Sequence, residues 1–173
     1  MRGHVMNGAV FIYEYAAYNR WANQQVVAWL KTKPADLMER ETPSSFPSLK
    51  QTLTHIWDTQ KWWCDVMQQA PTEAHYGRIF PGTMEELFDG LEQHSAEFAV
   101  LAASLSESAL EETCTFSIPY VGEFTRPRFE MIVHCVSHST YHRGQLVTMG
   151  RSLGFTDAPM TDYMFYLLMA KQS

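Results

Sequence analysis

The sequence predicts an all-α protein in which four long amphipathic helices form a four-helix bundle. Apolar residues recur at helical spacing in four segments of suitable length, turn-forming residues separate these segments, and 46% of the 173 residues are hydrophobic. A chain of this length can bury a sizeable core without disulfides, and neither an internal repeat nor a linker divides it. We therefore expect residues 1–173 to fold as a single domain.

The first two helices are expected on either side of a turn-rich segment. Residues 8–32 carry apolar side chains at helical spacing, and residues 42–47 are dense in proline, serine and threonine. Ser48 and Gln51 then stand three residues apart, as the two partners of a capping box do. A second helix is therefore expected over residues 49–69.

A second capping-box pattern marks the start of the third expected helix. Thr83 and Glu86 precede apolar residues at helical spacing, which predicts a helix over residues 84–104. Between residues 112 and 125 the pattern changes to β-branched and aromatic residues around Gly122. Such a segment is typical of an extended loop or a short hairpin.

The fourth long helix carries the most informative residues. It is expected to begin near Pro127, because proline suits the first turn of a helix, and to end near Leu153, just before Gly154. A short closing helix is expected over residues 159–170, after Asp157. The complete expectation is a four-helix bundle with a short extra helix at its C-terminal end.

Charge and composition narrow the classes of function. The chain has 13 basic and 19 acidic residues, a formal net charge of −6, and no basic patch that could follow a phosphate backbone. No apolar stretch reaches the roughly 18 residues of a membrane helix, and no secretion signal is recognisable. Three cysteines, Cys64, Cys114 and Cys135, lack paired spacing, which favours reduced thiols. We expect a soluble cytoplasmic protein that binds neither nucleic acid nor membranes.

Histidines recur at four-residue intervals in the fourth helix. His134, His138 and His142 share one face of a helix, and the nearby Met131 and Met149 indicate that this face points to the core. Two imidazoles crowded on a core face are hard to satisfy by hydrogen bonds, whereas two histidines at i and i+4 can bind one divalent metal ion. Histidines that are only core or interface residues are the alternative.

A third metal ligand has to come from another helix, and His55 in the second helix is the best candidate. Spacing alone does not decide whether His138 pairs with His134 or with His142. The two outer histidines lie about 12 Å apart along a helix, so all three cannot bind the same ion. The other histidines, which are His4, His75 and His94, are expected at the surface.

Four stretches of the chain carry a family signature. The most specific is the string His138-Ser139-Thr140-Tyr141-His142-Arg143-Gly144-Gln145-Leu146. Residues 18–23, residues 48–56, and Pro159 with Asp162 accompany it in the first helix, the second helix and the closing segment. Together these stretches resemble the DinB family, the DNA-damage-inducible group that includes the YfiT-like metal-dependent hydrolases. The resemblance covers nearly the whole chain.

The resemblance implies a four-helix bundle, usually a homodimer, with a divalent ion near one end of the bundle. Carried over to this sequence, the family's metal ligands are His55, His138 and His142, and His134 becomes a neighbour of the site. Zinc or nickel is the expected ion, while iron, manganese and copper are further candidates because three-histidine sites accept all of them.

The chain departs from the family pattern at one position. The family often has an acidic residue five positions after the first ligand, where this chain has Gln60. Asp58 would have to take over any role of that carboxylate, although a solvated or capping role fits Asp58 better. Cys135, one turn before His138, is expected to be a small buried apolar residue rather than a nucleophile.

Three residues of the signature string have architectural interpretations. Gly144 in a helix interior indicates close approach by another helix or loop, because glycine there costs about 1 kcal/mol relative to alanine. Arg143 is expected to pair with Asp162 or another carboxylate of the closing segment. Gln145 is expected to hydrogen-bond inside the bundle beside the metal site.

The predicted site is open, because three neutral imidazoles leave a divalent ion with at least one free position and its full charge. Such an ion can activate bound water or a bound thiol at neutral pH. By resemblance, the first hypothesis is a thiol-dependent S-transferase that adds a low-molecular-weight thiol, such as bacillithiol, to a small electrophile. A metal-dependent hydrolase with the same ligands is the second hypothesis. A non-catalytic, stress-related dimer that binds the metal or a small molecule is the third.

Overall fold

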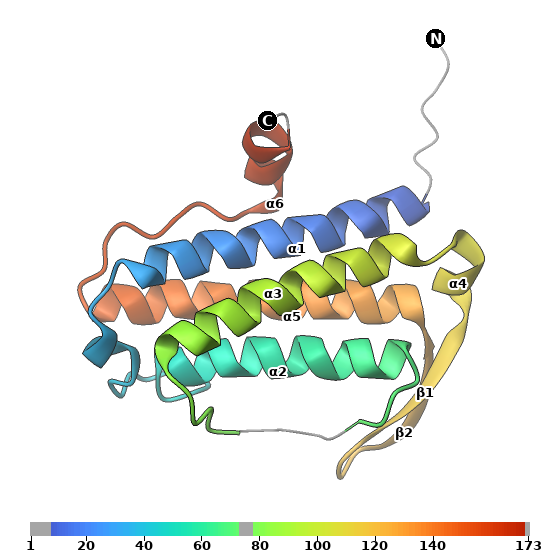
Figure 1. The fold of residues 1–173 in the computed structure, drawn as a ribbon, viewed down its shortest axis with the longest axis horizontal. Helices are drawn as coiled ribbons and strands as arrows, with labels where there is room; N and C mark the ends of the chain where they lie inside the picture. Colours follow the sequence, from blue (N-terminus) through green and yellow to red (C-terminus); the bar gives the residue numbers. More distant parts are fainter. Residues whose placement is uncertain (1–7, 73–77, 172–173) are drawn as a thin grey trace.

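The computed structural model describes residues 8–72 and 78–171, and these residues form a mostly helical protein built on a four-helix bundle. The long helices are α1 (Gly8–Lys31), α2 (Leu49–Met67), α3 (Met84–Ser104) and α5 (Arg128–Ser152) (Figure 1). The smaller elements are η1 (Ala35–Met38), α4 (Glu107–Glu111), β1 (Thr113–Ile118), β2 (Gly122–Pro127), α6 (Tyr163–Phe165) and η2 (Tyr166–Ala170). The bundle expected from the sequence is confirmed.

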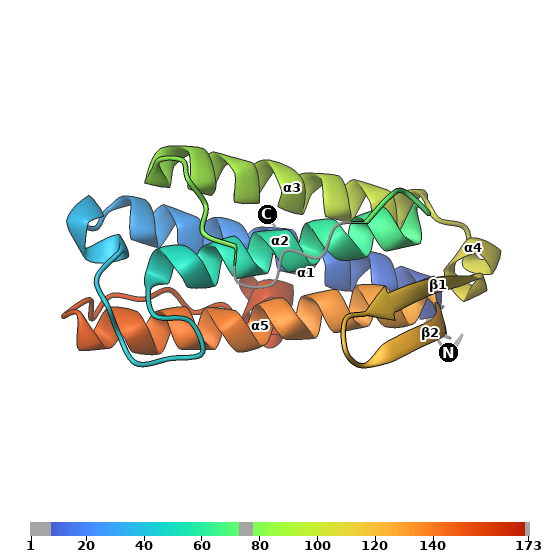
Figure 2. The same cartoon turned by 90° about the horizontal axis from the view of Figure 1, so that it is seen from below.

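The order of the helices around the bundle brings α2 and α5 together. Helix α1 packs against α3 and α5, and α2 packs against the same two helices. Helices α2 and α3 begin at the same end of the molecule, whereas α5 runs in the opposite direction (Figures 1 and 2). Helices α2 and α5 are therefore antiparallel neighbours, and side chains from the middle of each can meet between them.

The expected hairpin lies at the end of the bundle where α5 begins (Figure 2). Strands β1 and β2 pair antiparallel, with Thr113 opposite Pro127 and Ile118 opposite Gly122. Arg128, the first residue of α5, fastens this end because its guanidinium donates to the Met67 carbonyl at 2.9 Å and to the Glu112 carboxylate at 2.6 Å. The hairpin is thereby held against the C-terminal end of α2.

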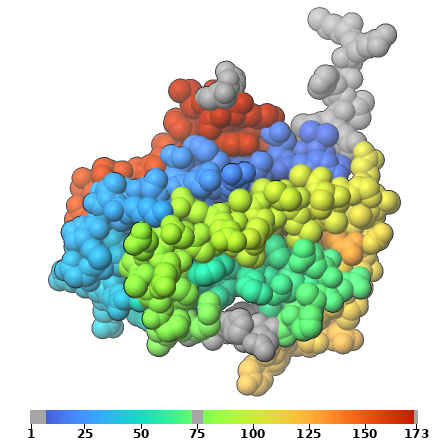
Figure 3. All heavy atoms as spheres, viewed as in Figure 1, coloured from blue at the N-terminus to red at the C-terminus, as the bar shows by residue number. Residues whose placement is uncertain are grey.

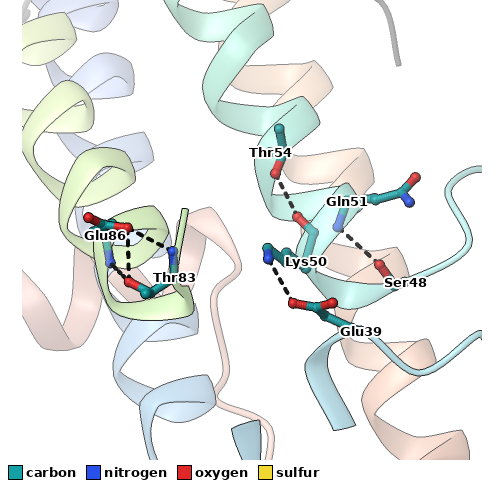
Figure 4. Close-up of polar contacts among 7 residues, drawn as sticks. All are labelled: Glu39, Ser48, Lys50, Gln51, Thr54, Thr83 and Glu86. Atoms are coloured by element: carbon teal, nitrogen blue, oxygen red, sulfur yellow. Dashed lines mark hydrogen bonds and ion pairs between the residues drawn. The ribbon is translucent and has the colours of Figure 1, made fainter. Parts of the chain in front are cut away.

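The predicted helix starts of α2 and α3 are confirmed, and side-chain caps explain them (Figure 4). The Ser48 hydroxyl accepts a hydrogen bond from the backbone N–H of Gln51 at 3.2 Å. At α3 the capping box is reciprocal: Thr83 accepts from the Glu86 backbone, and the Glu86 carboxylate accepts from the Thr83 backbone at 2.7 Å. These caps satisfy backbone donors that have no partner within the first turn of a helix.

The closing helix starts later than the sequence pattern predicts. Asp162 caps it, accepting from the backbone N–H of Phe165 at 2.8 Å, so the helix begins at Tyr163 rather than at residue 159. The preceding segment runs back along α1, and the closing helix rests on α1 (Figures 1 and 3). The short helices η1 and α4 were not expected, because four or five residues are too few to show a periodic pattern.

The close approach predicted at Gly144 is wrong. A Cβ atom built there would meet no atom within 4 Å, because this side of α5 faces outward. The bundle instead uses Gly90 and Gly150 for close contacts. The ring of Trp57 lies directly against Gly90, and the ring of Trp29 lies 2.6 Å from the Cβ position of Gly150. A side chain at either glycine would collide with an indole of a neighbouring helix.

Loss of the α3 capping box should destabilise the bundle. We expect Thr83→Ala to lower the free energy of unfolding by about 1 kcal/mol, because the hydroxyl that accepts from the Glu86 backbone N–H and donates to the Glu86 carboxylate is lost. Urea unfolding followed by circular dichroism measures the change. Thr72→Ala, at an exposed position outside the helices, is the matched control and should stay within about 0.5 kcal/mol of wild type. Equal effects of the two substitutions would contradict the role of the cap.

Candidate metal centre

Three histidine side chains converge between α2 and α5. His55 lies in the second turn of α2, and His138 and His142 lie one turn apart on α5. The Nε2 atom of His138 is 3.0 Å from Nε2 of His55 and 3.1 Å from Nε2 of His142. One nitrogen from each of the three rings lies within 4.8 Å of the other two. The three residues predicted from the sequence are thus brought together.

The spacing of these nitrogens fits a divalent metal ion. Metal–nitrogen bonds to histidine are about 2.0–2.1 Å long, so two bound nitrogens stand roughly 3.0 Å apart at a right angle and roughly 3.4 Å apart in a tetrahedron. The observed separations of 3.0 and 3.1 Å match this range. Without an ion, Nε2 of His138 has either one proton or one lone pair, and neither can satisfy both of the ring nitrogens that face it. A three-histidine group of this geometry could hold a metal ion.

The three imidazoles are poised to be neutral, which a metal ligand requires. Burial, followed by the charge that His142 would carry, lowers the pKa of His55 to about 4. Burial and then the neighbouring histidines lower the pKa of His138 to about 3. Burial also lowers the pKa of His142. At neutral pH each ring therefore keeps a lone pair available on one nitrogen.

A hydrogen bond that His142 donates to Gln145 orients the His142 ring. The Nδ1 atom of His142 lies 2.7 Å from Gln145 Oε1, and the amide nitrogen of Gln145 donates to the Ser45 hydroxyl at 2.7 Å. Because the amide oxygen can only accept, Nδ1 carries the proton and the lone pair is on Nε2, which faces the other histidines. The expected position of Gln145 beside the site is confirmed. Partners of this kind fix the tautomer of metal-binding histidines.

Aromatic rings border the three histidines on the side of the turn-rich segment before α2. The ring centroid of Phe46 lies 4.3 Å from that of His55 and 5.8 Å from that of His142. Tyr141 packs edge-on against His142 at 5.0 Å and is 63% exposed. Neither Phe46 nor Tyr141 could be predicted as a neighbour of the site, because aromatic residues in a loop and on a helix surface carry no spacing signal.

The structure decides which pair of histidines on α5 faces α2. His134 is outside the converging group, and its ring contacts His138 at a centroid distance of 5.8 Å and Trp63 at 5.1 Å. His55 lies level with the turn that carries His138 and His142, so the pair 138 and 142 is selected. His134 is a neighbour of the site, as the family resemblance implied.

The remaining histidines and acidic residues near the site have other roles. His94 is not a surface residue as expected: it is partly buried, and its Nδ1 atom lies 3.0 Å from Nε2 of Gln60. Gln60 is fully buried on the side of α2 away from the metal centre. Asp58 forms an ion pair with Arg78 at 2.6 Å and does not replace the missing carboxylate. His4 and His75 lie outside the described residues.

Arg143 does not pair with Asp162, contrary to the expectation. Its guanidinium is buried in the bundle and donates to the side-chain oxygens of Asn19 and Asn23, each at 2.8 Å, and to the Thr140 hydroxyl at 2.7 Å. Asp162 is occupied as a helix cap. Cys135 is fully buried, and burial raises the pKa of its thiol well above the usual range, which agrees with the expected apolar role.

Comparison with known proteins identifies the family. The DinB family profile matches residues 6–173. The chain belongs to the DinB family. Protein DinB of Bacillus subtilis (strain 168) is 30% identical, over 93% of this chain and 96% of its own length. The similarity to this DinB relative therefore covers both chains almost completely.

Crystal structures of two DinB-like proteins have the same fold. The protein from Bacillus cereus ATCC 10987 matches with a TM-score of 0.66 and 16% identity, over 83% of this chain and 91% of its own. YjoA from Bacillus subtilis matches with a TM-score of 0.64 and 14% identity, over 88% of this chain and 97% of its own. None of the helices in the described part of the chain is both long enough and apolar enough to cross a bilayer.

The lowered histidine pKa values predict acid sensitivity of the metal-free protein. An unfolded histidine titrates near pH 6.5, whereas folded His55 and His138 titrate near 4 and 3, so the unfolded chain binds more protons between these limits. Their contribution to stability is complete above about pH 6.5 and is lost as the pH falls toward 3. We expect His138→Gln to make the decline shallower, by at most about 1.4 kcal/mol per pH unit and by less where solvent reaches the ring.

Urea unfolding at a series of pH values, after metal removal, measures this difference. Carboxylates also titrate below pH 5, so the comparison between variant and wild type, rather than the wild-type curve alone, isolates the histidine. Parallel curves for the two proteins would contradict the lowered pKa of His138.

Proposed function

We propose that the protein is a metal-dependent enzyme that holds one divalent ion on His55, His138 and His142 and acts as a thiol-dependent S-transferase on small electrophiles. The observation that carries the proposal is the convergence of three neutral Nε2 atoms, 3.0 and 3.1 Å apart. Among the described residues, the candidate metal group has three members, all histidines. Catalytic metal sites characteristically have three protein ligands and an open position, whereas structural sites have four.

The chain's own residues would prepare the site in three ways. His55, His138 and His142 stay neutral at pH 7 because their pKa values are lowered. Gln145 holds His142 in the tautomer that presents Nε2. Phe46 packs against the rings of His55 and His142 and borders the histidine group on one side. An ion held there would supply a thiolate, or a hydroxide, at neutral pH.

In the proposed S-transfer, the thiol sulfur forms a bond to the electrophilic carbon, the leaving group departs with the bonding electron pair, and the thiol proton passes to solvent. The resemblance to thiol-dependent members of the DinB family supports this choice. A metal-dependent hydrolase is the alternative, because water could occupy the same open position. Zinc or nickel is the proposed ion.

We also propose the homodimer that the resemblance implies. The closing helical segment carries exposed apolar side chains, including Met164, Leu168 and Met169. This segment stands on the outer side of α1 (Figure 3). An apolar surface in that position supports an interface with a second copy of the chain.

Metal content tests the centre directly. Elemental analysis of the purified or reconstituted protein should find about one divalent ion per chain. His142→Ala should lose the ion because two ligands cannot replace three, whereas His134→Ala is the matched control and should keep it. An ion lost equally from both variants, or a wild type that holds none after reconstitution, would overturn the proposed centre.

S-transfer is then tested with the loaded protein. 1-Chloro-2,4-dinitrobenzene is offered with a panel of small thiols that includes bacillithiol, and the thioether product is followed by absorbance. His142→Ala should abolish the protein-dependent rate. A loaded wild type that forms no thioether with any thiol, yet hydrolyses carboxylic esters, would favour the hydrolase instead.

Removal of the partner of His142 should weaken the metal centre without destroying it. We expect Gln145→Ala to lower the affinity for zinc by about 10- to 100-fold, because the orientation and tautomer of His142 are no longer fixed. Competition with a chromogenic chelator measures the affinity. Gln93→Ala, on the exposed side of α3, is the control. Unchanged zinc affinity in Gln145→Ala would show that the hydrogen bond does not support the ligand.

A further inference from the structure

A groove of about 280 Å³ lies beside the histidine centre, between the hairpin and the helices α2 and α5. Figure 2 shows how the hairpin folds along the first turns of α5. The apolar walls of the groove come from all three elements: Trp63 from α2, Phe116, Ile118 and Phe124 from the hairpin, and Met131 from α5. Phe116 and Ile118 both face the groove because successive side chains of a strand point to opposite faces of the sheet.

The volume of the groove limits the size of an occupant. An apolar cavity of about 150 Å³ is large enough for benzene, and sites for drug-sized molecules begin near 300 Å³. A groove of about 280 Å³ therefore suits one aromatic ring with small substituents. Nucleotides and peptides are too large to be enclosed there.

The walls favour a flat, aromatic occupant. The rings of Trp63 and Phe116 meet edge to face with centroids 4.9 Å apart, and Phe124 follows Phe116 at 6.1 Å. Phe124 is 36% exposed although it is apolar, which leaves part of its ring without a covering group. Aromatic side chains arranged in this way offer edge and face contacts to a further ring.

A loosely paired arginine lies at the exposed rim of the groove. Arg126 from β2 and Glu130 from α5 both line the groove, and their closest nitrogen and oxygen atoms are 3.9 Å apart. This separation is too long for a hydrogen bond, so the guanidinium can still pair closely with a carboxylate of a bound molecule. Both side chains are largely exposed, and the contribution of such a pair is correspondingly modest.

His134 is the lining residue of the groove that lies next to the histidine centre. Its ring lies 5.8 Å from the ring of His138. His134 and Glu130 precede His138 by one and two turns of α5, or about 6 and 12 Å along the helix. A single-ring molecule in the groove would therefore have one end near the histidine centre and the other near Arg126.

We propose that this groove binds the electrophilic co-substrate, and that this co-substrate is a single-ring aromatic compound with an anionic group opposite its reacting carbon. This assignment rests on the proposed S-transferase function, in which a small thiol reacts with the electrophile. The ring packs between Trp63, Phe116 and Phe124, and Arg126 pairs with the anionic group. The reacting carbon then points past His134 toward the histidine centre.

Equilibrium binding tests the groove without chemistry. The probe is 4-methylbenzoate, and 4-methylbenzyl alcohol is its neutral counterpart. Ligand-observed NMR titrations use the full-length protein both loaded and metal-free, because the metal-free form excludes direct coordination of the carboxylate. We expect the acid to bind up to about five-fold more tightly than the alcohol, the effect of one exposed ion pair.

Two substitutions and a matched control locate the binding. Phe124→Ala should weaken both probes about tenfold, since a wall of the groove is removed. Arg126→Gln should remove only the preference for the acid. Val121→Ala makes a smaller apolar truncation at the exposed turn of the same hairpin, outside the groove, and should change the binding of neither probe. Metal content should be the same in all three variants.

The outcomes separate this assignment from the proposed function. Binding to metal-free wild type that is weakened about tenfold in Phe124→Ala but unchanged in Val121→Ala supports the groove. Equal binding by these two variants, or none by a folded wild type, overturns the groove and leaves the S-transferase standing on its own assay. With 4-(chloromethyl)benzoate and an active thiol, Phe124→Ala should raise KM much more than it lowers kcat. If Phe124→Ala leaves KM unchanged although the wild-type groove binds the probes, the assignment of the groove to the electrophile is overturned.

Discussion

The guanidinium group of Arg143 lies inside the bundle, and the positions of the surrounding helices follow from how its charge is satisfied. The residue is 2% exposed, and its hydrogen-bond acceptors are neutral oxygens from Asn19, Asn23, Thr140 and Tyr18. A buried charge without such partners is costly, and a partly satisfied one is strongly destabilising. Helices α1 and α5 must therefore keep the register in which these four oxygens meet Arg143.

The same network extends to the other two long helices. Because Asn19 and Asn23 turn their oxygens toward Arg143, their amide nitrogens point away from it. Within the buried interior they donate to Gln60 of α2 and Ser95 of α3. Gln60 in turn places its amide nitrogen 3.0 Å from His94. Each group orients the next, so one buried cation restrains all four helices. We infer that this network sets the register of the helices in the bundle. In that register His142, which precedes Arg143 in the chain, faces His55 on α2.

The three-histidine group and the Arg143 network lie on different sides of α5. The buried side carries the Arg143 guanidinium, whose terminal nitrogens donate to neutral oxygens while its Nε has no hydrogen-bond partner among the described residues. The histidine side carries neutral groups whose lone pairs face one another. No carboxylate belongs to the three-histidine group in the described part of the chain. An ion held by neutral ligands keeps its full charge, which favours an anionic partner from solution such as a thiolate.

Local signals in the sequence determined most of the fold. Caps at Ser48 and Thr83, helical periodicity and the change of pattern near Gly122 depend on neighbours within a few residues, and the structure contains the elements they predict. The shared face of His138 and His142 follows from the same periodicity. The late start of the closing helix and the outward position of Gly144 were mispredicted, because helical propensity and glycine content do not show what packs against a segment.

The choices that define the site were made only by tertiary packing. Spacing left two histidine pairs on α5 open, and the position of His55 relative to α5 selected His142 over His134. The partners of Arg143 and Gln60 also could not be inferred, since Arg143 meets Asn19 across 124 positions of sequence. Periodicity and capping are set by the backbone within a few residues, whereas ligand choice and burial of charge depend on distances between helices, which no local pattern records.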